Sequence, residues 1–266
     1  MSDSISAPSP LLAALEVRAV CERAQMAALR PALRRLPKGD GHPVLVLPGF
    51  STSDRSTAEL RDLLKRLGYR TYGWGLGVNV GPTSRILEGL VDRLDRAHRR
   101  RGEPVSIVGW SLGGIYAREL ARARPTDVRQ VITLGSPIQM VAADSSTAQP
   151  MYATLRKYHS PEFDRPMRES GRPLLPVPST SIYTQTDGVV SWQACLVRRA
   201  PTSENVRVHG SHCGLGFNAA AITVIADRLA QPAGTWERFS APWYLRGAFP
   251  PSTDLDTSRA PHAPAA

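Results

Sequence analysis

The central part of the chain alternates short apolar runs with longer segments that carry apolar residues at helical spacing. Strands and helices that alternate in this way form a parallel sheet covered by helices on both faces. The predicted strands lie at residues 42–47, 70–74, 104–108, 130–134, 181–184 and 205–208. The predicted helices lie at residues 56–67, 83–101, 111–124 and 219–229. The sequence therefore predicts an α/β fold built on a mostly parallel central sheet.

A chain of 266 residues is long enough for one large domain with a sizeable core. We assign the main domain to residues 42–230, preceded by a loose segment and helical arm at 1–41 and followed by an extension at 231–266. Residues 138–178 lose the periodic pattern and accumulate prolines. Long irregular insertions are usually functional, so this one is predicted to form a lid over the strand ends. The tail from Pro250 is predicted to be disordered.

The N-terminal arm has an amphipathic helical pattern over residues 11–36, which Pro31 is predicted to break or kink. Two interpretations remain open for its apolar stripe. We prefer packing against the main domain, and the alternative is contact with a membrane surface, because stripes flanked by arginine occur in both settings.

The net charge of +10 is compatible with binding to nucleic acid or to an anionic membrane. Lysine occurs only at positions 38, 65 and 157, so 30 of the 33 basic residues are arginine, and they are scattered over almost every segment. Because no groove-reading motif accompanies them, nucleic-acid binding is not predicted.

The first twenty residues contain two acidic residues, lack a basic start and lack a long apolar stretch. They predict a cytoplasmic protein with no signal peptide and no transmembrane segment. The three cysteines, Cys21, Cys195 and Cys213, lack the paired spacing of a zinc site, and no metal or cofactor is expected.

Residues 109–114 read GWSLGG and lie between a predicted buried strand and a predicted helix. This is the context of a nucleophile elbow, in which a serine occupies a strained turn. The tight turn leaves no room for side chains two residues away on either side, hence the glycines at 109 and 113. Ser111 is the predicted nucleophile.

The order of later polar residues supports the same chemistry. Asp187 directly follows the strand at 181–184, and His212 follows the strand at 205–208. A serine hydroxyl becomes an effective nucleophile when a neutral imidazole removes its proton, and a buried carboxylate holds that imidazole in the required tautomer. We therefore predict a triad of Ser111, Asp187 and His212.

Other residues could fill two of these roles. His209 is an alternative general base, although it extends the predicted strand. Asp164 in the predicted lid and Glu204 before the last strand are alternative acids.

Acyl transfer through a tetrahedral intermediate needs two backbone donors aimed at the oxyanion. We assign them to the amides of Leu112, directly after the nucleophile, and Phe50, in the turn after the first strand. The alternative for the Phe50 turn is an ordinary turn without a role in the reaction. Trp110 is predicted to line an apolar acyl pocket with the lid, and its alternative role is core packing behind the elbow.

Four segments together resemble the bacterial lipase and esterase branch of the α/β-hydrolase family: LPGF at 47–50, GWSLGG at 109–114, DGVV at 187–190 and GSH at 210–212. The resemblance covers about residues 42–230. It implies the α/β-hydrolase fold and hydrolysis of esters through an acyl-enzyme intermediate. The apolar pocket predicted for Trp110 and the lid favours small carboxylic esters with hydrophobic acyl groups. An acyltransferase or thioesterase would use the same triad, and a hydrolase-fold binding protein without activity is a further alternative.

Cys195 lies eight residues after Asp187, and Cys213 directly follows His212. A disulfide between them would tie the loop of Asp187 (the acid loop, residues 186–190) to the loop of His212 (the histidine loop, residues 210–214). Reduced thiols are instead expected in a cytoplasmic protein. Both readings stay open at the level of sequence.

Overall fold

The computed structural model describes residues 4–100, 102–141, 144–163 and 168–255. In this part of the chain, one sheet has the strand order β2-β1-β3-β4-β5-β6, and every neighbouring pair is parallel. The strands are β1 Pro43–Leu47, β2 Arg70–Gly73, β3 Val105–Trp110, β4 Val128–Leu134, β5 Ser179–Tyr183 and β6 Ser203–Arg207. The predicted α/β class and parallel sheet are confirmed.

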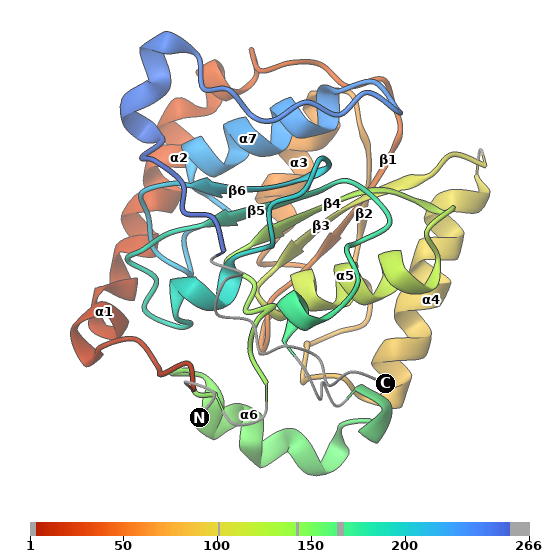
Figure 1. The fold of residues 1–266 in the computed structure, drawn as a ribbon. Helices are drawn as coiled ribbons and strands as arrows, with labels where there is room; N and C mark the ends of the chain where they lie inside the picture. Colours follow the sequence, from red (N-terminus) through yellow and green to blue (C-terminus); the bar gives the residue numbers. More distant parts are fainter. Residues whose placement is uncertain (1–3, 101, 142–143, 164–167, 256–266) are drawn as a thin grey trace.

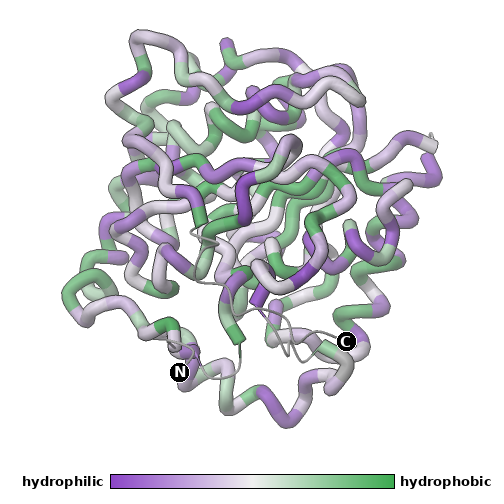
Figure 2. The backbone as a smooth tube through the Cα atoms, viewed as in Figure 1, coloured by the Kyte–Doolittle hydropathy of each residue, from purple (hydrophilic) through white to green (hydrophobic). Residues whose placement is uncertain are grey.

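Helices cover both faces of the sheet (Figure 1). Val44 and Val46 of β1 face a core formed with α2, α3 and α7, whereas Leu45 and Leu47 face a core formed with α4 and α5. Alternate residues of a strand point to opposite faces, so a strand covered on both sides reads as a continuous apolar run. The helices are α2 Ala19–Leu33, α3 Ala58–Arg66, α4 Ser84–Arg99, α5 Leu112–Ala123 and α7 Ala219–Ala230. Figure 2 shows hydrophobic residues along the central strands.

The strand order reverses between β1 and β3, since the chain moves outward to β2 and then returns to the other side of β1. In open α/β sheets, ligands bind outside the carboxyl ends of the strands at such a switch point. The turn after β1 and the elbow after β3 both lie at this edge.

The N-terminal arm consists of α1 Pro10–Ala14, a 3-10 turn at Leu15–Arg18 and α2. Met26 and Leu33 of α2 are buried in the core shared with α7, so the arm packs on the main domain. Pro31 lies in the last turn of α2 and does not interrupt it, and the irregular turn comes earlier. The helix therefore continues through Pro31 without the predicted break. None of the described helices has both the length and the apolar character needed to cross a bilayer.

The insertion between β4 and β5 is largely irregular, as the sequence predicts. Its described parts hold one short helix, α6 Gln149–Leu155, and 3-10 turns at Arg156–Tyr158, Pro161–Phe163 and Glu169–Gly171. Its end is fixed to α5, because Glu169 is buried and forms ion pairs with Arg118 and Arg122.

The C-terminal extension packs back on the main domain. It contains a 3-10 turn at Trp243–Ala248, and Phe239 and Phe249 pack against the core to which α7 contributes. Residues 250–255 differ from the prediction of disorder: Thr253 N–H donates to the Tyr183 hydroxyl at 2.7 Å, and Arg207 N–H donates to Ser252 Oγ at 3.0 Å. The rest of the predicted tail lies outside the described residues.

Candidate active site

Ser111 occupies a sharp turn between β3 and α5. Its backbone has φ 53° and ψ −122°, a conformation that residues other than glycine rarely adopt. A Cβ atom added at Gly109 would lie 2.4 Å from Gly114 Cα, and one at Gly113 would lie 2.5 Å from Leu47 O. The glycines are therefore required by close backbone contacts, as expected for the elbow, and the serine is held in a strained position.

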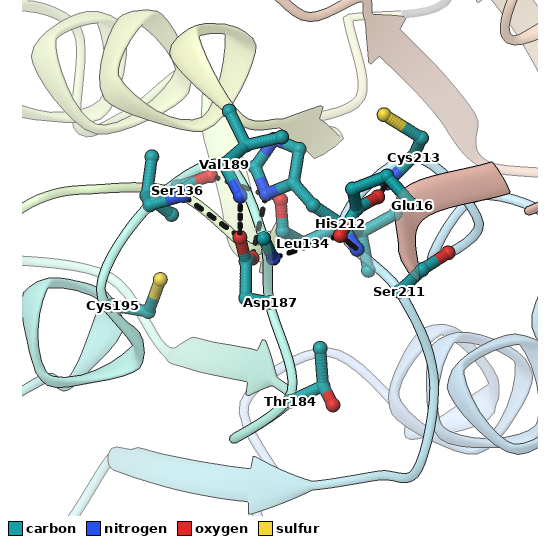
Figure 3. A network of polar contacts seen from close by, with 12 residues as sticks. Glu16, Leu134, Ser136, Thr184, Asp187, Val189, Cys195, Ser211, His212 and Cys213 are labelled. Atoms are coloured by element: carbon teal, nitrogen blue, oxygen red, sulfur yellow. Dashed lines mark hydrogen bonds and ion pairs between the residues drawn. The ribbon is translucent and has the colours of Figure 1, made fainter. Parts of the chain in front are cut away.

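His212 and Asp187 form a buried hydrogen-bonded pair (Figure 3). The imidazole Nδ1–H donates to Asp187 Oδ2 at 2.6 Å. The other carboxylate oxygen accepts the backbone N–H groups of Val189 and Val190, each at 2.8 Å. Because both oxygens are engaged, the carboxylate is fixed in orientation, and it fixes the orientation of the ring.

The pKa of His212 is raised above its usual value. Burial alone would lower this pKa, but the charge and hydrogen bond of Asp187, together with the charge of Glu16, outweigh the effect of burial. The environment of the imidazole therefore favours its positively charged form, which a general base adopts after it has taken a proton.

The histidine loop is attached to the elbow through Trp110. The indole Nε1–H donates to the backbone carbonyl of His212 at 3.1 Å. Ser111 N–H donates to Leu134 O at 2.8 Å, which ties the elbow to the end of β4. Among the described residues, no hydrogen bond joins Ser111 Oγ to His212 Nε2. In enzymes without substrate this last contact is often long.

Two of the alternative site residues, His209 and Glu204, lie in the described part of the chain. His209 is exposed, and its carbonyl accepts the side-chain amide of Asn218. Glu204 is buried at the start of β6, where it accepts hydrogen bonds from Thr180, Arg228 and the Phe239 N–H. Asp164 lies outside the described residues.

A cavity of about 430 Å³ opens beside Ser111. Its volume is within the range of sites that enclose small ligands. The walls are mostly apolar and come from the elbow, the turn after β1, the acid loop and the insertion. They include Phe50, Ser111, Leu112, Ile115, Met140, Tyr152, Phe163, Val189 and Val190.

Trp110 does not line this cavity, contrary to the prediction of a role in substrate binding. Its side chain belongs to the opposite core, with Val108, and packs edge-on against Phe217 with ring centroids 5.8 Å apart. The reason is the alternation along β3, which directs residues 108 and 110 to the same face. The alternative interpretation, core packing behind the elbow, describes its position.

The suggested disulfide is not formed, because Cys195 and Cys213 are both free thiols. The two residues lie on opposite sides of the Asp187–His212 pair (Figure 3). Cys195 is fully buried, which raises the pKa of its thiol. In the described ranges of the chain, no group of three or more His, Cys, Asp or Glu side chains is placed to hold a metal ion.

One residue beside the Asp187–His212 pair had no predicted role in the site. Glu16 of the N-terminal arm accepts hydrogen bonds from the backbone of both the acid loop and the histidine loop. No motif marks this residue, because its partners are more than 170 positions away in the sequence.

No protein-family model matches the chain, and no curated protein matches its sequence. Solved structures do resemble it. Lipase B of Aspergillus fumigatus has a TM-score of 0.57 and 16% identity, covering 75% of this chain, which spans 55% of the lipase's length. A lipase-esterase related protein of Clostridium acetobutylicum ATCC 824 has a TM-score of 0.52 and 12% identity, covering 73% of this chain and 97% of that one.

An α/β superfamily hydrolase of Oenococcus oeni PSU-1 has a TM-score of 0.50 and 18% identity. The match covers 71% of this chain and 91% of the hydrolase's chain. At these low identities the likeness concerns the fold. The parallel sheet, the helices on both faces and these neighbours together identify the chain as one with the α/β-hydrolase fold.

Proposed function

We propose that the protein is a serine hydrolase that cleaves carboxylic esters. The observation that carries the proposal is the strained Ser111 beside an apolar cavity, with the bonded Asp187–His212 pair on the neighbouring loops. A strained backbone at a non-glycine residue persists only where the surroundings enforce it, and such positions cluster at active sites.

In the proposed reaction, Ser111 Oγ attacks the ester carbonyl carbon while His212 Nε2 removes the hydroxyl proton. Asp187 keeps the other ring nitrogen protonated and stabilises the imidazolium. The tetrahedral intermediate collapses to an acyl-enzyme as His212 protonates the leaving alcohol. Water, activated by the same imidazole, then attacks the acyl carbon, and the carboxylic acid leaves as Ser111 regains its proton.

The proposed oxyanion donors are the backbone N–H groups of Leu112 and Phe50. Leu112 is the first residue of α5, where an N–H has no partner within the helix. The turn before Phe50 lies against the nucleophile, because a Cβ added at Gly49 would be 3.2 Å from Ser111 Cβ. Donors fixed before the reaction stabilise the oxyanion strongly, since no reorganisation is needed.

The apolar walls of the cavity favour acyl groups made of hydrocarbon over charged acyl groups. A cavity of about 430 Å³ favours short to medium acyl chains over long ones.

The test is hydrolysis of p-nitrophenyl esters of graded acyl length by the wild type and by Ser111→Ala. We expect the wild type to be fastest on short to medium chains and Ser111→Ala to lose more than about 10³-fold in kcat. Ser84→Ala is the matched control, because this serine is exposed at the start of α4. Full activity in Ser111→Ala would refute the proposal. Parallel assays with acyl thioesters and with added alcohols separate hydrolysis of esters from thioester cleavage and acyl transfer.

A further inference from the structure

The N-terminal arm lies across both loops that carry the acid and the base. Gly188 of the acid loop contacts the arm so closely that a Cβ there would lie 2.2 Å from Leu12 O. Arg18 donates to the carbonyl of Thr186 in the acid loop and to that of Gly210 in the histidine loop. The arm therefore joins two loops that come from different strands.

Glu16 makes the same connection with a single carboxylate. Its Oε1 accepts the backbone N–H groups of Gly188 at 2.8 Å and His212 at 2.9 Å, and its Oε2 accepts that of Cys213 at 2.8 Å. Hydrogen bonds to an ionised acceptor are stronger than those between neutral groups. One half-buried side chain thus fixes the backbone of the predicted base and the residue that follows the predicted acid.

Glu22 extends this connection along the histidine loop. Its Oε1 accepts the Ser211 N–H at 2.8 Å, and its Oε2 receives the side-chain amide of Asn218 at 3.5 Å. Three consecutive backbone N–H groups, at residues 211–213, are therefore bonded to carboxylates of the arm.

We propose that Glu16 is a positioning residue: it holds the acid loop and the histidine loop in the relative placement that aligns Asp187 with His212. The inference rests on the proposed hydrolase function, because it assigns the arm a part in that reaction. Both oxygens of Glu16 bond the backbone of these loops, so its effect on the reaction passes through the placement of the imidazole.

Glu16 also contributes negative charge beside the imidazole. Burial would raise the pKa of Glu16, but its three backbone hydrogen bonds and the charge of His212 lower it, so the carboxylate is ionised at neutral pH. The charged and titratable groups around the His212 loop are Asp187 from the acid loop, Cys213 from the histidine loop, and Glu16, Arg18 and Glu22 from the arm. Of the arm residues, Glu16 contributes to the raised pKa of His212.

Two substitutions separate the hydrogen bonds from the charge. Glu16→Ala removes both, and we expect kcat on the best p-nitrophenyl ester to fall about tenfold to a hundredfold with little change in KM, since small misplacements of reacting groups have effects of this size. Glu16→Gln keeps one carbonyl oxygen for Gly188 and His212 but removes the charge and the acceptor for the Cys213 N–H. Its kcat should fall less, and the acid limb of its kcat/KM profile should move to lower pH, because the pKa of His212 falls.

Glu59→Gln is the matched control. Glu59 also holds the arm to the main domain, through an ion pair with Arg23 of α2, but it contacts neither loop. We expect this variant to keep the wild-type kcat and pH profile. Thermal unfolding of each variant shows whether activity is measured on folded protein. If Glu16→Ala does not fold, Glu16→Gln still tests the proposal, because it preserves the shape of the side chain.

The outcomes distinguish failure of the positioning role of Glu16 from failure of the proposed hydrolase function. An active wild type with Glu16→Gln and Glu16→Ala unchanged in kcat and in pH profile would overturn the positioning role and leave the proposed function intact. Equal losses in Glu59→Gln would also overturn it, because attachment of the arm in general would then be responsible. A wild type inactive on every ester would overturn the proposed function itself, and the positioning role with it.

Discussion

Asp187→Asn tests the half of the proposed triad that is hydrogen-bonded in the structure. The carboxylate accepts Nδ1–H of His212 on one oxygen and the N–H groups of Val189 and Val190 on the other. An asparagine keeps a carbonyl oxygen for the two backbone groups and turns its amide N–H₂ toward the imidazole. Nδ1 must then accept a hydrogen bond, which places the ring proton on Nε2. That nitrogen can no longer take the proton of Ser111.

The size of the effect follows from this change of tautomer. The loop geometry survives, so the loss comes from the base itself, and the same kind of substitution in serine proteases lowers kcat by about 10⁴. Four factors of ten at about 1.36 kcal/mol each correspond to about 5.4 kcal/mol of lost transition-state stabilisation. The pair is buried and 2.6 Å apart, so water cannot replace the carboxylate.

The assay is kcat on the best p-nitrophenyl ester, with thermal unfolding measured in parallel. Asp254→Asn is the matched control, because this aspartate forms an exposed ion pair with Arg199 and, within the described residues, has no hydrogen bond to Asp187 or His212. It should retain wild-type kcat. If Asp187→Asn keeps more than about a tenth of the wild-type kcat while remaining folded, the orienting role of Asp187 is refuted.

Two further predictions concern His212 and its support. Because the pKa of His212 is raised above 6.5 and a general base must be neutral, the acid limb of kcat/KM should have its midpoint above pH 6.5; a midpoint below this value would contradict the pKa direction. The matching contribution to stability is fully present below about pH 6.5 and is lost as pH rises through the folded-state pKa. Trp110→Phe removes the donor to the buried His212 carbonyl, so unfolding free energy should fall by about 1–3 kcal/mol and kcat should also fall; denaturant unfolding that matches the wild type would exclude this support.

The parts of the fold that followed from the sequence have local causes. The run at Val44–Leu47 is apolar because helices cover both faces of β1, and its pattern is visible without knowing the neighbours. The elbow at Ser111 was recognisable because close backbone contacts demand glycine on both sides of it. The predicted strand at 205–208 begins two residues after the observed start of β6. A charged residue at Glu204 does not indicate a buried strand, and its burial depends on the ion pair with Arg228.

The unpredicted parts depend on contacts between distant segments. The alternation along β3 places Trp110 on the same face of the sheet as Val108. The sequence does not show which of the two faces borders the cavity. No sequence motif marks Glu16, because its hydrogen-bond partners lie in loops near the other end of the chain. Residues 250–255 are polar and Pro-containing, yet hydrogen bonds to Tyr183 and Arg207 hold them against the body.

The backbone conformation of Ser111 sets stability against function at one position. A residue with a side chain at φ 53° and ψ −122° destabilises the native state on the order of 1–3 kcal/mol relative to glycine, which reaches this region freely. Selection for a more stable fold alone would therefore place glycine at 111. Serine at position 111 therefore lowers the stability of the native state, a cost that agrees with the proposed use of its hydroxyl in catalysis.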